Sequence, residues 1–138
     1  MSNSGIGFIG LGQMGLGMAN NLAKIAAPFY AYDAMPAATD RLKGDDIIIA
    51  STLGNLAANC HLIFLCLPSA KEVNEVIFGA GGIAESAQGD LAIIDTSTID
   101  RLEATAIHDQ LAGRGIAYAD CPISGLPFRA TDGTLTLM

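Results

Sequence analysis

The sequence predicts an α/β domain with a doubly wound, mostly parallel sheet and helices on both faces. Along its 138 residues, short apolar runs alternate with amphipathic stretches, and Gly, Asp or Pro separates them. Hydrophobic residues make up 51% of the chain and 16 residues are Gly, which is typical of a buried parallel sheet with tight turns. This length fits one domain, so we assign residues 1–138 to a single unit.

The hydrophobic pattern locates the individual elements. Apolar runs predict strands at residues 6–9, 28–32, 47–50, 62–66, 91–94 and 116–119, and residues 134–138 predict the start of a seventh. Helical spacing of apolar residues predicts helices at 13–24, 36–42, 53–59 and 100–111. Ser69 and Glu72 match a capping box, so a further helix is expected to begin there.

Charge and cysteine usage exclude several classes of function. The net charge is -7 and the 7 Lys and Arg residues are scattered, so no nucleic-acid partner is expected. The cysteines show no metal-ligand spacing, which predicts free thiols in a reducing cytoplasm and no metal site. The longest apolar run, residues 62–67, is too short to span a membrane, and no targeting segment is visible. We therefore expect a cytoplasmic protein.

A glycine-rich turn follows the first predicted strand. Residues 10–15 read G-x-G-x-x-G, made up of Gly10, Leu11, Gly12, Gln13, Met14 and Gly15. This pattern between a strand and a helix is typical of a Rossmann-like dinucleotide-binding domain, because the helix start offers unpaired N–H groups to a pyrophosphate. Gly10 permits the tight turn, Gly12 lets the pyrophosphate approach the backbone, and Gly15 permits close helix–strand packing.

Asp33 ends the second predicted strand, about 20 residues after the turn. Its carboxylate can accept hydrogen bonds from both ribose hydroxyls of an adenosine, whereas it would repel a 2′-phosphate. Ala34 and Met35 follow it, so no adjacent Arg neutralises such a phosphate. NAD is therefore predicted as the cofactor in preference to NADP, with Arg41 as the residue that would reach a 2′-phosphate in the opposite case.

Residues 8–22 closely resemble the signature of the β-hydroxyacid dehydrogenases. They read Phe-Ile-Gly-Leu-Gly-Gln-Met-Gly-Leu-Gly-Met-Ala-Asn-Asn-Leu. This family includes 3-hydroxyisobutyrate dehydrogenase, 2-hydroxy-3-oxopropionate reductase and 6-phosphogluconate dehydrogenase. Three further segments resemble family motifs in the same order, namely Leu67-Pro68, the D-x-S-T of residues 95–98, and residues 120–125 continuing to 133–136. The resemblance covers nearly the whole chain.

The resemblance implies a role for each of these segments. It implies that Leu67 and Pro68 lie against the cofactor, that Thr98 contacts the nicotinamide end, and that Ser124, Gly125 and Leu126 belong to the substrate-binding segment. Each segment also has a structural interpretation. Pro68 can simply end a strand, Ser97 or Thr98 can cap the helix near Asp100, and Ser124-Gly125 can form a plain turn.

The chain departs from the family pattern at two positions. Leu126 stands where the second Gly of Ser-Gly-Gly is expected, and Arg129 replaces a Gly. Leu adds bulk and forbids backbone conformations that are open to Gly, so we expect a reshaped substrate pocket. Arg129 is either a ligand of a substrate carboxylate or a solvated loop charge.

The family's general acid–base Lys lies on a helix after the nucleotide domain, followed by a helical second domain. Here the lysines are Lys24, Lys43 and Lys71, and none follows Ser124. We expect a truncated domain without a catalytic residue of its own and inactive by itself. Its parent would be an NAD-dependent oxidoreductase that interconverts a small β-hydroxy acid and its semialdehyde or keto form.

Two other functions fit parts of the sequence. One is a non-catalytic dinucleotide-binding or dimerisation module, and the other is a Rossmann-like methyltransferase. Gly15 and the later motifs count against the methyltransferase. Apolar surface left exposed by an incomplete domain predicts a homo-oligomer.

Overall fold

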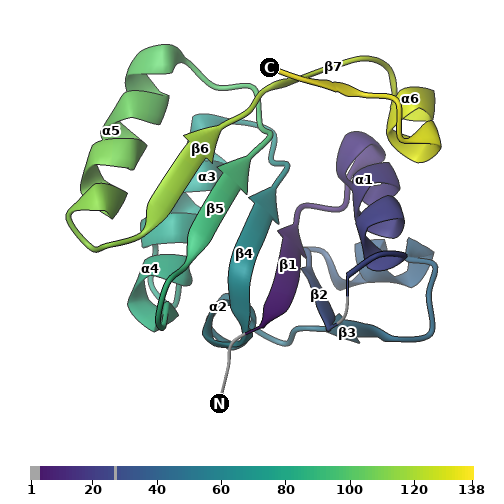
Figure 1. Ribbon diagram of the computed structural model, residues 1–138, viewed down its shortest axis with the longest axis horizontal. Helices are drawn as coiled ribbons and strands as arrows, with labels where there is room; N and C mark the ends of the chain where they lie inside the picture. The colour runs from purple at the N-terminus through teal and green to yellow at the C-terminus, as the bar shows by residue number, and fades with distance from the viewer. Residues whose placement is uncertain (1–3, 27) are drawn as a thin grey trace.

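The computed structural model describes residues 4–26 and 28–138 of the predicted domain (Figure 1). Six strands form one sheet in the order β3-β2-β1-β4-β5-β6, and every neighbouring pair is parallel. These strands are β1 (Gly5–Ile9), β2 (Phe29–Tyr32), β3 (Ile47–Ile49), β4 (Cys60–Leu65), β5 (Ala92–Asp95) and β6 (Ala117–Asp120). The predicted fold class is confirmed, and so are the six strands of the main sheet.

Helices cover the sheet because each parallel connection must cross over a face. The helices between these strands are α1 (Gln13–Ala23), η1 (Pro36–Arg41, a 3₁₀ helix), α2 (Leu53–Asn59), α3 (Ala70–Phe78), α4 (Ile83–Ser86) and α5 (Arg101–Ala112). Two apolar cores result. The core that contains Phe8 and Ala19 lies on the α1 side, and the larger one, which contains Ile63, Val73 and Ile107, lies on the α3 and α5 side.

The strand order reverses direction at β1, which pairs with β2 on one side and β4 on the other. From β1 the chain runs outward through β2 to β3, then returns to β4 and continues to β6. The connections on either side of this switch point cross opposite faces of the sheet. A crevice therefore remains beyond the carboxyl ends of β1 and β4, and ligands of such sheets bind in this crevice.

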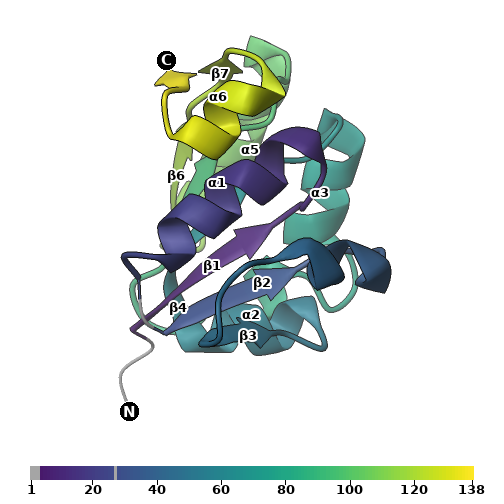
Figure 2. The same cartoon turned by 90° about the vertical axis from the view of Figure 1, so that its right-hand side faces the viewer.

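The last part of the chain forms a small unit apart from the main sheet. It consists of β7 (Ile123–Ser124), α6 (Pro127–Asp132) and β8 (Thr136–Leu137), with β7 and β8 paired antiparallel. The tail was predicted to begin a seventh strand. It does contain a strand, but within the described residues that strand pairs with β7 and not with the main sheet, because the chain turns back through α6. Figure 2 shows α6 lying beside α1, on which it packs.

Ser69 is the N-cap of α3, but it does not form the predicted capping box. Its hydroxyl donates a hydrogen bond to the Glu72 carboxylate and makes no bond to the helix backbone. The helix begins as predicted, but the Ser69 half of the capping box is absent, because its hydroxyl bonds to Glu72 and to no backbone N–H; the Glu72 carboxylate does reach back to the Ser69 N–H.

Within the described residues, no helix combines the length and apolar character needed to cross a membrane.

Cys60 begins β4 and is fully buried against α2 and β1. Burial raises the pKa of its thiol from 9.0 to about 12. An unfolded chain loses this proton above pH 9 while the folded chain keeps it, so the unfolded state binds fewer protons. We predict that the free energy of unfolding falls as the pH rises from 9 to 10, by up to about 1.4 kcal/mol per pH unit from this thiol.

Urea unfolding at pH 8, 9 and 10 measures this slope. The Cys60→Ala variant, although less stable overall, should lose less stability over this interval than the parent chain. Equal slopes for the two proteins would show that the buried thiol does not contribute.

Candidate functional site

The turn after β1 is so tightly enclosed that its first residue must be Gly. Gly10 has a φ of +102° and donates its N–H to the carbonyl of Tyr32 at 3.1 Å. A Cβ built on it would lie 2.1 Å from the carbonyl oxygen of Cys66. The chain therefore passes between the ends of β2 and β4 only because Gly10 has no side chain.

Gly12 and Gly15 play opposite parts in the same turn. A Cβ on Gly15 would lie 1.9 Å from the carbonyl oxygen of Gly10, so this residue permits α1 to pack against the turn. A Cβ on Gly12, the N-cap of α1, would meet no atom within 4 Å. No side chain caps α1 and its first turn has no acidic residue. Its terminal N–H groups and positive dipole end are therefore available to an anion.

Asp33 lies just beyond β2 and joins the glycine turn after β1 to the segment that follows β2. Its carboxylate accepts hydrogen bonds from the N–H of Leu11 at 2.7 Å and from the N–H of Met35 at 2.8 Å. It therefore holds the glycine turn in place, a role that the sequence did not reveal. Each carboxylate oxygen keeps a further lone pair that can accept a bond from a ligand hydroxyl.

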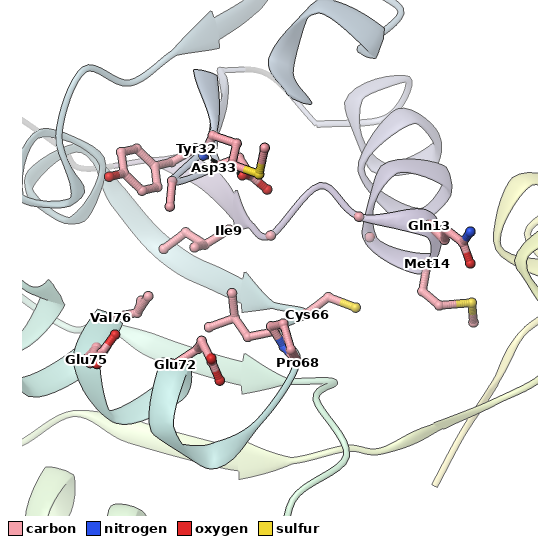
Figure 3. A pocket seen from close by; sticks show the side chains of 16 residues that line it. Ile9, Gln13, Met14, Tyr32, Asp33, Cys66, Pro68, Glu72, Glu75 and Val76 are labelled. Carbon is pink, nitrogen blue, oxygen red and sulfur yellow. Dashed lines mark hydrogen bonds between the residues drawn. The ribbon is translucent and has the colours of Figure 1, made fainter. Parts of the chain in front are cut away.

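These residues line a cavity of about 610 Å³ (Figure 3). Gly10, Gly12, Gln13, Met14, Gly15, Asp33, Leu67 and Pro68 all line it. Leu11 does not, because its side chain is buried in the core on the α1 side. Its N–H instead holds Asp33.

The opposite wall comes from α3, and sequence reasoning missed it. Glu72, Glu75 and Val76 face Asp33 across the cavity in Figure 3. The available signal was the position of the helix directly after Leu67-Pro68, which places its first turns at the carboxyl edge of the sheet. Among the residues that the structure describes, the lining contains three carboxylates and no Lys or Arg, so Arg41 does not line it.

A second cavity, of about 300 Å³, adjoins the first. Both are lined by Met14, Cys66, Leu67 and Pro68, and the second adds Thr96, Ser97, Thr98, Ile123 and Gly125. The structure thus brings Pro68, Thr98 and Gly125 together from three separate segments. Ser124 and Leu126 flank Gly125 but line neither cavity; both are exposed, as is Arg129 on α6.

A hydrogen-bond network fixes the walls of the second cavity. The hydroxyl of Ser97 accepts a bond from the N–H of Leu67 at 2.8 Å, which ties the loop after β4 to the loop after β5. The fully buried Asp95 accepts bonds from the Ser97 N–H at 3.0 Å and the Tyr118 hydroxyl at 2.7 Å. Burial and the nearby Asp95 raise the pKa of Tyr118, so the phenol remains protonated and continues to donate.

The helix-cap interpretation of Ser97 and Thr98 is wrong. The N-cap of α5 is Asp100, whose carboxylate accepts a bond from the Leu102 N–H at 2.7 Å. The Ser97 hydroxyl accepts its bond from the N–H of Leu67, and Thr98 lines the second cavity. In the described part of the chain, no group of His, Cys, Asp and Glu residues is arranged to hold a metal ion.

The sequence profile of the NAD-binding domain of 6-phosphogluconate dehydrogenase matches residues 5–138. Mouse mitochondrial 3-hydroxyisobutyrate dehydrogenase is 35% identical over 137 residues, which are 99% of this chain and 41% of that protein. The chain therefore spans less than half the length of this relative.

Two solved structures share the fold along nearly the whole chain. One is the 3-hydroxyisobutyrate dehydrogenase of Mycobacterium tuberculosis with L-serine, at a TM-score of 0.88 and 25% identity, covering 98% of this chain and 45% of that one. The other is Psf3 in complex with NADP⁺ and 2-OPP, at a TM-score of 0.85 and 27% identity, covering 96% and 47%.

Ser97→Ala should lower the free energy of unfolding by about 1–3 kcal/mol, because the N–H of Leu67 loses its partner in a partly buried place. Denaturant titration measures this loss. Thr105→Ala is the matched control, since Thr105 is exposed and its hydroxyl donates to the Arg101 carbonyl of its own helix. An equal effect of the two substitutions would show that the bond to Leu67 is unimportant.

Proposed function

The chain belongs to the family of the NAD-binding domain of 6-phosphogluconate dehydrogenase, and on this premise we propose that it forms the cofactor-binding part of a β-hydroxyacid dehydrogenase. The proposed reaction interconverts a small β-hydroxy acid and its semialdehyde or keto form. A bound nicotinamide dinucleotide supplies the hydride acceptor or donor.

One observation carries this proposal: Gly12 opens onto the large cavity at the uncapped start of α1, with Asp33 beside it. The space that a side chain would fill is left free where the helix N–H groups point. That arrangement fits a pyrophosphate at the turn and the adenosine ribose at Asp33. The second cavity would then take the nicotinamide end, against Pro68 and Thr98.

The charges along the cavity support NAD over NADP. Asp33, Glu72 and Glu75 are all acidic, and none of the described residues that line the cavity is a Lys or Arg that could compensate an additional phosphate. Negatively charged carboxylates repel the additional phosphate of NADP, so they disfavour its binding relative to NAD. A structural neighbour holds NADP⁺, so the preference in this chain depends on these side chains and not on the fold.

The names of the relatives support a β-hydroxy acid as substrate. The mouse relative is named for 3-hydroxyisobutyrate, and the mycobacterial neighbour was solved with L-serine, which carries its hydroxyl on the β-carbon. We propose that Ser124 and Gly125 contact the substrate next to Thr98. Leu126 is 63% exposed, so its bulk is available to alter the entrance to the site.

We further infer that residues 1–138 do not turn over by themselves. Lys24, Lys43 and Lys71 line neither cavity. We propose that the Lys that exchanges the proton accompanying hydride transfer comes from the second domain found in the family. The homo-oligomer, the cytoplasmic location and the absence of a nucleic-acid partner stay predictions.

Gly12→Ala tests the cofactor site without disturbing the fold. Because an added Cβ at Gly12 meets no protein atom, we expect nearly unchanged thermal unfolding but NADH binding weakened about tenfold or more. Calorimetric titration measures binding. Gly15→Ala is the contrasting variant, and it should lose stability because its Cβ collides with the Gly10 carbonyl. NADH binding that survives Gly12→Ala undiminished would refute the proposed pyrophosphate position.

Asp33→Asn tests the cofactor preference. The amide oxygen can still accept a bond from Leu11 or Met35, whereas the charge is gone, so NADH should bind more weakly and the gap to NADPH should narrow. Parallel titrations with the two cofactors measure the ratio of dissociation constants. Asp90→Asn, before β5 at the opposite edge of the sheet, is the control and should leave that ratio unchanged.

A further inference from the structure

The small unit that carries the proposed substrate segment is attached to α1 through a short helix. α6 has six residues, and Ala130 is its buried residue. A helix this short is not stable in water without tertiary contacts. The order of the segment from Ile123 to Leu137 therefore depends on how α6 is held.

One side chain of α1 holds the end of α6. The amide nitrogen of Asn21 donates to the carbonyl of Ala130 at 2.8 Å and to the carbonyl of Thr131 at 3.1 Å. Carbonyls at a helix end lack regular helical partners. Within its own segment the Ala130 carbonyl accepts only a long bond, of 3.4 Å, from the Gly133 N–H, so the shorter bond from Asn21 is its stronger one. The helix then ends at Gly133, which has a φ of +74°.

The backbones of the two helices touch at this place. A Cβ on Gly17 would lie 2.7 Å from the nitrogen of Thr131 and 2.9 Å from the Cβ of Ala130. Gly17 therefore permits the approach, and Asn21, one turn later on α1, fixes the register. A cavity of about 180 Å³ adjoins this contact, and its lining includes Asn21 of α1, Phe8 and Phe64 of the sheet, and Leu135 and Leu137 of the small unit.

The other end of α6 connects to the second cavity. Gly125 lines that cavity two residues before α6, and a Cβ on it would lie 3.1 Å from the Cδ of Arg129. The position of α6 thus determines where Gly125 lies relative to Thr98. We propose that Asn21 is a positioning residue, which sets the substrate segment against the nicotinamide end by holding α6 on α1. The proposal rests on the proposed function for the identity of the site.

The matched pair of variants is Asn21→Ala and Asn20→Ala. Asn20 is the neighbouring amide on the same helix, but its oxygen accepts a bond from the Lys43 N–H at 2.8 Å, near the end of η1. Hydrogen exchange by mass spectrometry should show residues 123–137 exchanging about tenfold faster or more in Asn21→Ala. Asn20→Ala should leave that segment protected. Unchanged protection in Asn21→Ala would overturn the proposal.

A second measurement separates positioning from a merely structural role. With NADH bound, Asn21→Ala should keep the parent's dissociation constant within about twofold, because Asn21 does not line the cofactor cavity. The nicotinamide fluorescence should decrease, since Gly125 no longer shields that end from water. Loss of exchange protection with unchanged nicotinamide emission would overturn the positioning role.

Asn21→Asp adds a readout that depends on pH. A carboxylate cannot donate to the α6 carbonyls, whereas a protonated carboxyl can. The Lys24 ammonium lies 3.2 Å from the Asn21 amide oxygen and would favour the carboxylate, so protection of residues 123–137 should recover only below about pH 4. A pH-independent loss would contradict the hydrogen-bond mechanism. If NADH does not bind the parent chain, the proposed function fails, while the exchange experiments still decide whether Asn21 holds the segment.

Discussion

The contact between the start of α1 and the end of β1 determines how close the helix lies to the sheet. The Cβ position of Gly15 falls 1.9 Å from the Gly10 carbonyl, and that of Gly10 falls 2.1 Å from the Cys66 carbonyl. Three backbones are thus packed together without side chains between them. This packing leaves the helix start facing the crevice and places Asp33 within 2.7 Å of the turn. Every other feature of the site is arranged around it.

At the carboxyl edge of the sheet, hydrogen bonds between polar groups hold the loops together, in addition to the packing of the apolar core. Ser97 joins the loops after β4 and β5, and Asp95 joins β5 to Tyr118 on β6. Because these groups are buried and paired, the loops that line the second cavity have little freedom to rearrange. Close backbone packing fixes the glycine turn at the large cavity, whereas a side-chain network fixes the loops at the second.

Sequence reasoning predicted the elements whose signal is local. The apolar runs located the six strands of the main sheet, and the spacing of Gly10, Gly12 and Gly15 located the turn, because in each case neighbouring residues carry the pattern. The pairing of β7 with β8 was missed, since two-residue strands have no period to detect.

Features that depend on distant residues were also missed. Ser97 bonds Leu67 across 30 positions, and Asn21 bonds Ala130 across 109. The Ser69 hydroxyl bonds to the Glu72 side chain and not to the helix backbone. Both partners are near in sequence, so the capping pattern alone does not predict which of them the hydroxyl binds. The wall formed by Glu72 and Glu75 could be predicted in full only once the strand order was known, because that order places α3 opposite Asp33.

The strand order also has a consequence for biosynthesis. β1 precedes the other five strands of the main sheet in the sequence but lies in the interior of that sheet, between β2 and β4. A nascent chain that has not yet released residues 60–65 can pair β1 with β2 but leaves its other edge open. Such an unpaired apolar edge is prone to pair with other chains. During this interval on the ribosome, the glycine-rich turn has no β4 to pack against, so the crevice forms only after β4 and α3 have also emerged.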